Sequence, residues 1–138
     1  MFQKILVPVD FTDKNEAALE LAADLARRSG GEVALLHVIE TLELPPDEVQ
    51  EFYDRLEARA GEKMEEMSAR LRDAGVPVVQ RISYGKRVPE IVEYAEASDQ
   101  ELVIMDSHRL GPEHVEGGGL TISHQVAIFA PCPVLLLR

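Results

Sequence analysis

Short apolar runs alternate with longer amphipathic segments along the sequence, and this alternation constrains the fold more than any other feature. Apolar residues in the longer segments recur every three or four positions, which indicates helices. The short runs are rich in Val, Ile and Leu and predict strands buried in a parallel sheet. Strands that alternate with helices need right-handed crossovers, so we predict an α/β fold, a three-layer α/β/α domain with a five-stranded parallel sheet. The predicted strands are Lys4–Asp10, Val33–Ile39, Val76–Ser83, Leu102–Met105 and Val134–Leu137.

Local cap signals bound the predicted helices. Asp13 and Glu16 have the spacing of a capping pair and predict a helix over Asn15–Ser29. A hydroxyl residue, Thr121 or Ser123, is expected to cap the last helix.

The sequence is strongly acidic, with 25 acidic and 14 basic side chains in 138 residues and a net charge of -11. This charge repels phosphate backbones and anionic lipid surfaces, so we predict no nucleic-acid binding. No apolar stretch is long enough to span a bilayer, so no membrane insertion is expected. The length favours one domain, residues 1–138. A single cysteine, Cys132, and the lack of a signal-peptide pattern predict a cytoplasmic location.

The carboxyl ends of the predicted strands are where a ligand is expected. In open parallel sheets, ligands bind at this edge where the strand order reverses. That rule points to Pro8–Asp10, Val38–Glu40 and the loop Asp106–Thr121. The loop is long for a compact domain, and such loops are often functional.

Three segments carry a family resemblance through their order and spacing: Lys4–Asp10 (KILVPVD), Leu35–Val38 (LLHV) and Ala130–Arg138 (APCPVLLLR). They resemble the opening strand, the second strand and the closing signature of the universal stress protein family. The resemblance covers the whole chain. It implies an adenine nucleotide alpha hydrolase-like fold with strand order 3-2-1-4-5, and a homodimer.

The last strand independently favours a homodimer. In the implied strand order it lies at an edge of the sheet, and an exposed apolar edge strand promotes aggregation unless it is paired. Two-fold pairing would hide that edge. The predicted interface residues are Val134, Leu135, Leu136 and Leu137.

The loop after the fourth strand departs from the pattern of the family's ATP-binding members. Those members carry Gly-x-x-Gly after this strand and, further on, Gly followed by Ser or Thr. Asp106, Arg109 and Leu120 stand at the three glycine positions here, and only Thr121 keeps the pattern. Two like charges ~4 Å apart repel by ~4 kcal/mol at an effective dielectric of ~20. The Asp106 carboxylate therefore predicts weakened binding of ATP phosphates.

Other features favour an altered nucleotide site. Gly117, Gly118 and Gly119 could form a different nest of amides, and His108 and Arg109 could supply positive charge. By the resemblance, Pro8, Asp10 and Val38 match adenosine-facing positions, with the Asp bonded to ribose. The candidate ligand-binding residues are Pro8, Val9, Asp10, Val38, Met105, Asp106, Ser107, His108, Arg109, Gly118, Gly119 and Thr121.

The remaining reactive side chains predict neither a metal site nor catalysis. The spacing of the histidines near the loop fits no standard metal motif, and His37 lies in a buried-strand pattern. Ser107 and Ser123 lack a nucleophile-elbow context. Cys132, between two prolines, is predicted to be a structural thiol.

We predict a universal stress protein-like regulatory or stress-response binding module that does not bind ATP strongly and is not an enzyme with turnover. Two alternatives stay open. One is an ATP-, ADP- or AMP-binding stress protein that acts as a sensor or a slow ATPase. The other is a protein-interaction subunit that works with an unidentified protein partner and has no small-molecule ligand.

Overall fold

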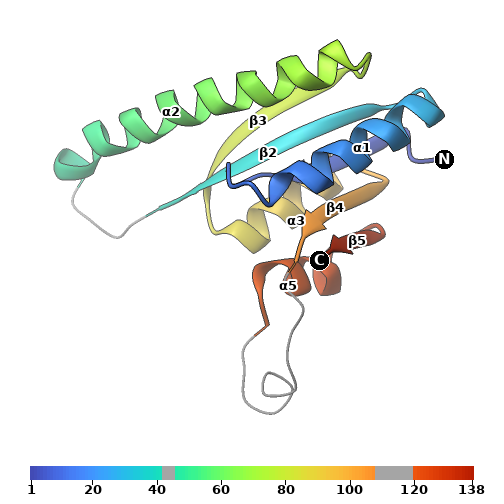
Figure 1. Ribbon diagram of the computed structural model, residues 1–138. Coiled ribbons are helices and arrows are strands. Elements are labelled where there is room, and N and C mark those ends of the chain that lie inside the picture. The colour runs from blue at the N-terminus through green and yellow to red at the C-terminus, as the bar shows by residue number, and fades with distance from the viewer. Residues whose placement is uncertain (42–45, 108–119) are drawn as a thin grey trace.

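The computed structural model describes residues 1–41, 46–107 and 120–138, and in these ranges strands alternate with helices as the sequence predicts (Figure 1). The strands are β1 (Lys4–Pro8), β2 (Glu32–Glu40), β3 (Val78–Gly85), β4 (Leu102–Asp106) and β5 (Val134–Leu137). The helices are α1 (Asn15–Ser29), α2 (Pro46–Asp73), α3 (Arg87–Ala97) and α5 (Ile122–Phe129).

The described strands form one parallel sheet in the order β3-β2-β1-β4-β5, which confirms the predicted fold class and strand order. Helices α1 and α2 cover one face, and α3 and α5 cover the other (Figure 1). Strand β1 lies at the centre, and the order in which strands are added to the sheet reverses between β1 and β4. Both edge strands, β3 and β5, lie at the positions that the sequence predicts.

Side chains alternate across the sheet and divide the core into two clusters. Ile5 and Val7 of β1 face α1 and α2, where Met64 of α2 is fully buried. Leu6 of β1 faces the opposite way and packs in the cluster that contains Val126 of α5. A parallel sheet covered on both faces needs such continuous apolar strands, because each residue has a core to face.

Two predicted local features have different outcomes. The predicted Asp13 cap is wrong: Lys14 holds the N-cap position of α1, has helical dihedrals and makes no side-chain cap bond. The predicted Thr121 cap is confirmed, because its Oγ1 accepts a hydrogen bond from the backbone N–H of His124 at 3.4 Å. No helix within the described ranges combines the length and apolar character needed to cross a membrane.

A glycine fixes the join between α1 and β2. The Gly31 N–H donates to the Ala26 carbonyl at 2.9 Å, and its Cα packs against the backbone of Gln3, just before β1. A Cβ at this position would lie 2.5 Å from the Gln3 carbonyl oxygen. Only glycine fits without moving β1 or β2.

We predict that Gly31→Ala lowers the free energy of unfolding by about 1–3 kcal/mol, the usual cost of overpacking. Gly61→Ala is the matched control, because a Cβ there meets nothing within 4 Å on α2. That control should raise stability by up to about 1 kcal/mol through helix propensity. Urea denaturation measures both, and equal stability of Gly31→Ala and the wild-type protein would contradict the close approach.

Candidate functional site

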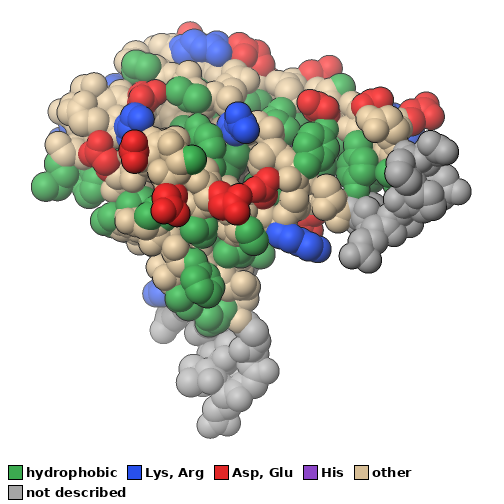
Figure 2. Space-filling model, turned by 180° about the vertical axis from the view of Figure 1, so that it is seen from behind, with side chains coloured by type: hydrophobic (Ala, Val, Ile, Leu, Met, Phe, Trp, Pro, Cys, Tyr) green, Lys and Arg blue, Asp and Glu red, His purple; other side chains and the backbone are tan. Residues whose placement is uncertain are grey.

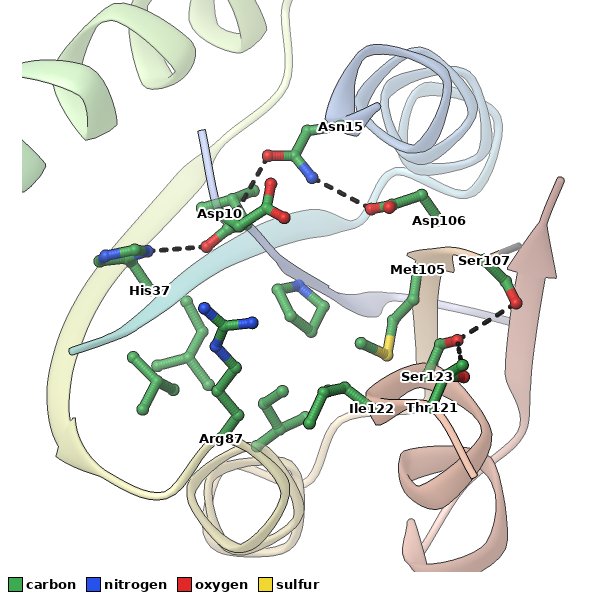
Figure 3. A pocket seen from close by; sticks show the side chains of 15 residues that line it. Asp10, Asn15, His37, Arg87, Met105, Asp106, Ser107, Thr121, Ile122 and Ser123 are labelled. Carbon is green, nitrogen blue, oxygen red and sulfur yellow. Dashed lines mark hydrogen bonds between the residues drawn. The ribbon is translucent and has the colours of Figure 1, made fainter. Parts of the chain in front are cut away.

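A cavity of about 230 Å³ opens at the carboxyl ends of β1, β2 and β4, the place that the rule for open parallel sheets predicts (Figure 3). Its apolar wall comes from both the strands and the helices α3 and α5. The wall contains Pro8, Leu36, Val38, Ile91, Met105 and Ile122. We call this space the first cavity.

The structure brings the described part of the predicted set together in the first cavity: Pro8, Val9, Asp10, Val38, Met105, Asp106, Ser107 and Thr121 all line it. The other predicted residues, His108, Arg109, Gly118 and Gly119, lie outside the described residues, as does Gly117. The roles of all twelve candidates stay predictions.

A buried amide organises one side of the first cavity. Asn15, the first residue of α1, is 1% exposed. Its Oδ1 accepts hydrogen bonds from the backbone N–H groups of Asp10 at 3.0 Å and Phe11 at 2.9 Å. Its Nδ2 donates to Asp106 Oδ1 at 3.1 Å (Figure 3). One side chain therefore joins the ends of β1 and β4.

Sequence reasoning missed Asn15, although a signal was present. It lies three residues before Ala18 and seven before Ala22, so it shares the buried face of α1. A polar residue on such a face needs hydrogen-bond partners, since a buried unsatisfied group is costly.

Asp10 forms a turn with Thr12 at the end of β1. Its Oδ1 accepts from Thr12 N–H at 3.1 Å and from Thr12 Oγ1 at 2.7 Å. Partial burial raises the pKa of Asp10, but the Thr12 hydrogen bonds and the charge of Arg87 outweigh it and leave the pKa below its ordinary value. Both Thr12 hydrogen bonds go to Oδ1, and Asp10 lines the first cavity.

Phe11 and His37 form an aromatic pair beside Asp10. Their ring centroids are 4.3 Å apart, and Nδ1–H of His37 donates to the Val9 carbonyl at 2.8 Å. Phe11 has a φ of 65°, which is strained for a bulky residue. The ring contact and the Asn15 hydrogen bond hold it there. The buried-strand pattern around His37 predicts a packed ring, and the ring does pack against Phe11, but it is only half-buried and lines the first cavity.

Hydroxyl groups line the cavity at the start of α5. Thr121 Oγ1 lies 2.5 Å from His124 Nδ1 and 3.2 Å from Ser123 Oγ. Ser123 is buried, and its hydroxyl donates to Ser107 Oγ at 3.2 Å (Figure 3). These groups therefore bond largely to one another.

Arg87 is the second functional candidate that sequence reasoning missed. It is the first residue of α3, and its guanidinium points into the first cavity towards Asp10 (Figure 3). Its Nε lies 3.6 Å from Glu40 Oε1. A signal was present here too, because Lys86 and Arg87 put positive charge at a helix N-terminus, where the helix dipole disfavours it.

A larger cavity of about 440 Å³ adjoins the first one, between α2 and the end of β2. We call it the second cavity. Asp10, His37, Val38 and Arg87 line both cavities.

The described residues contain no group of three or more His, Cys, Asp or Glu side chains that could hold a metal ion. Cys132 packs against the core cluster of α3 and α5, and burial raises the pKa of its thiol. A raised pKa disfavours the reactive thiolate, which agrees with the predicted structural role.

Comparison with known proteins gives a consistent result. The sequence profile of the Universal stress protein family matches residues 1–138. Universal stress protein MJ0577 of Methanocaldococcus jannaschii is 31% identical over 126 residues, which cover 78% of each chain. Its solved structure superposes with a TM-score of 0.84 over 99% of this chain and 96% of that one, at 33% identity.

Two further solved structures share the fold. UspA of Lactobacillus plantarum has a TM-score of 0.83 and 26% identity, covering 99% of this chain and 98% of its own. The universal stress protein of Archaeoglobus fulgidus in complex with dAMP has a TM-score of 0.73 and 23% identity, with both chains covered completely.

We predict that an NMR titration of the His37 ring gives a pKa below the ordinary value of 6.5. Burial is the largest cause, and the Arg87 charge adds to it against the opposing effects of the Val9 hydrogen bond and Asp10. Arg87→Gln should therefore raise the His37 pKa.

The same shift has a consequence for stability. Below about pH 6.5 the unfolded chain binds the proton more readily than the folded one, so His37 makes stability fall as the pH drops through this range. A His37 pKa at or above 6.5 would contradict the burial of the ring.

Proposed function

The chain belongs to the universal stress protein family, and from this membership and the first cavity we propose that it is a stress-response module that binds an adenine nucleoside or its monophosphate. The observation that carries the proposal is the cavity itself. An apolar wall and a carboxylate meet at the point where the strand order of a parallel sheet reverses.

The first cavity has the chemistry that a nucleoside needs. Pro8, Val38 and Met105 offer apolar surface to the faces of a planar base. Asp10 Oδ2 can accept a hydrogen bond from a ribose hydroxyl, while Oδ1 stays in the turn with Thr12. The fold relative from Archaeoglobus fulgidus was solved in complex with dAMP, a nucleoside monophosphate that carries the adenine base proposed for this site.

Asp106 argues against strong binding of ATP in the loop after β4. Asn15 holds its carboxylate at the end of that strand, beside the hydroxyls of Ser107 and Thr121. A phosphate chain placed there would meet a negative group in a partly buried site, where charge repulsion is only partly screened.

We predict that millimolar adenosine raises the melting temperature. A ligand at 100 times its dissociation constant adds about 2.7 kcal/mol of stability. Asp10→Ala should abolish the shift, because it removes the ribose acceptor.

Thr12→Ala is the matched control, because it breaks the side-chain bond of the turn but keeps the carboxylate. Its adenosine shift should persist. The proposal would fail if neither adenosine nor AMP shifted the melting temperature, or if Asp10→Ala bound adenosine as well as the wild-type protein.

We propose further that the module is a cytoplasmic homodimer, that residues 1–138 act as one domain, and that β5 forms the dimer interface. Two observations support β5. It lies at an edge of the sheet, and apolar side chains are exposed around it. Ile128 is 61% exposed, Phe129 64% and Leu135 38%. Figure 2 shows hydrophobic side chains exposed over the region of α5.

The four predicted interface residues differ in what they contact within one chain. Val134 and Leu136 pack against the core cluster of α3 and α5, and Leu137 packs against the cluster of α1 and α2. Only Leu135 is exposed by more than a third. A charge at Leu135 therefore tests the interface with the least damage to the core.

We predict that Leu135→Lys combined with Ile128→Lys converts a dimer into a monomer in sedimentation experiments. Val79→Lys is the matched control, because Val79 is 42% exposed on β3, the opposite edge strand. That variant should stay dimeric. A double variant that keeps the wild-type mass would contradict an interface at β5.

A further inference from the structure

We propose that the two cavities form one bipartite site, in which the base lies in the first cavity and the anionic group of the ligand lies in the second. The phosphate of a nucleoside monophosphate then points towards α2 and away from the loop that follows β4. This inference rests on the proposed function and specifies the orientation of the ligand.

The shared wall supports a single ligand that spans both spaces. Four residues from three elements or their ends line both cavities, and they include Asp10 and Arg87. The first cavity alone, at about 230 Å³, is smaller than the ~300–1,000 Å³ typical of ligand pockets, and the second adds about 440 Å³.

Charge distinguishes the two ends of this combined site. The lining of the first cavity contains Asp10, Asp106 and Arg87, which is one more acidic than basic side chain. The lining of the second contains Arg59, Lys63 and Arg87 against Asp10 and Glu40, which is one more basic than acidic side chain. An oxyanion is therefore favoured in the second cavity, despite the net charge of -11.

Arg59 and Lys63 are available to a ligand. They lie four residues apart on one face of α2, so both reach the same cavity. Neither forms an ion pair or hydrogen bond with a described residue, whereas Arg70 and Arg72 on the same helix pair with Glu16 and Glu65. Guanidinium and ammonium groups are the usual partners of phosphate.

Each acidic residue of the second cavity has one carboxylate oxygen with a partner in the chain. Glu40 lies beside Arg87, with 3.6 Å between Oε1 and Nε. Asp10 Oδ1 is held by two hydrogen bonds from Thr12. At the opposite end, Asn15 bonds to Asp106, and the hydroxyls of Thr121, Ser123 and Ser107 bond to one another.

Isothermal titration calorimetry of the full chain with adenosine and with AMP tests the inference. AMP should bind roughly tenfold more tightly than adenosine, the effect of about one charge-assisted hydrogen bond. Arg59→Gln combined with Lys63→Gln should remove this advantage and leave adenosine affinity unchanged.

Arg55→Gln combined with Arg81→Gln is the matched control. It also removes two positive charges, but from exposed positions on α2 and β3 that line neither cavity. In this control AMP should still bind more tightly than adenosine. If both double variants lost the affinity difference equally, a long-range effect of net charge would explain it and the inference would be overturned.

The remaining outcomes separate this inference from the proposed function. Adenosine and AMP that bind equally well would overturn the orientation but keep the nucleoside site. No binding of either would overturn both. An AMP advantage that survives Arg59→Gln with Lys63→Gln but increases on Asp106→Asn would place the phosphate at the loop after β4, which also overturns the inference.

Discussion

The hydrogen bonds of the buried Asn15 amide are the interaction on which the site depends. Asn15 accepts from two backbone N–H groups after β1 and donates to Asp106 at the end of β4. A buried amide left without partners costs about 1–3 kcal/mol, so the two strand ends are held in one arrangement. The same bonds support the strained backbone of Phe11 and place Asp10 at the cavity edge. The hydrogen bonds of Asn15 therefore join the adjacent ends of β1 and β4 into one side of the first cavity.

This arrangement also explains how the chain keeps the fold of its family while changing the chemistry of one end of the cleft. Asp106 puts a carboxylate where the ATP-binding pattern has a glycine, and Asn15 satisfies one of its oxygens. The cations lie on the other side of Asp10, on α3 and α2. In the binding mode that we propose, the base stays in the first cavity and the anion lies in the second.

The sequence predicted most of the fold because the fold rests on patterns that extend over many residues. Strands buried on both faces and amphipathic helices are visible as periodicity, and the family resemblance supplied the strand order. The failures were local. Asp13 has the spacing of a cap, but the chain is already helical at Lys14. Asn15 and Arg87 each have a partner far along the chain, Asp106 and Glu40, 91 and 47 residues away, which local spacing does not identify. The predicted residues in 108–119 lie outside the described ranges.

A crystal structure of the protein with AMP tests the central claim most directly. We predict the adenine against Pro8, Val38 and Met105, a ribose hydroxyl on Asp10, and the phosphate beside Arg59 and Lys63. A phosphate bound instead at Thr121 and Ser123, or a base outside the first cavity, would contradict it.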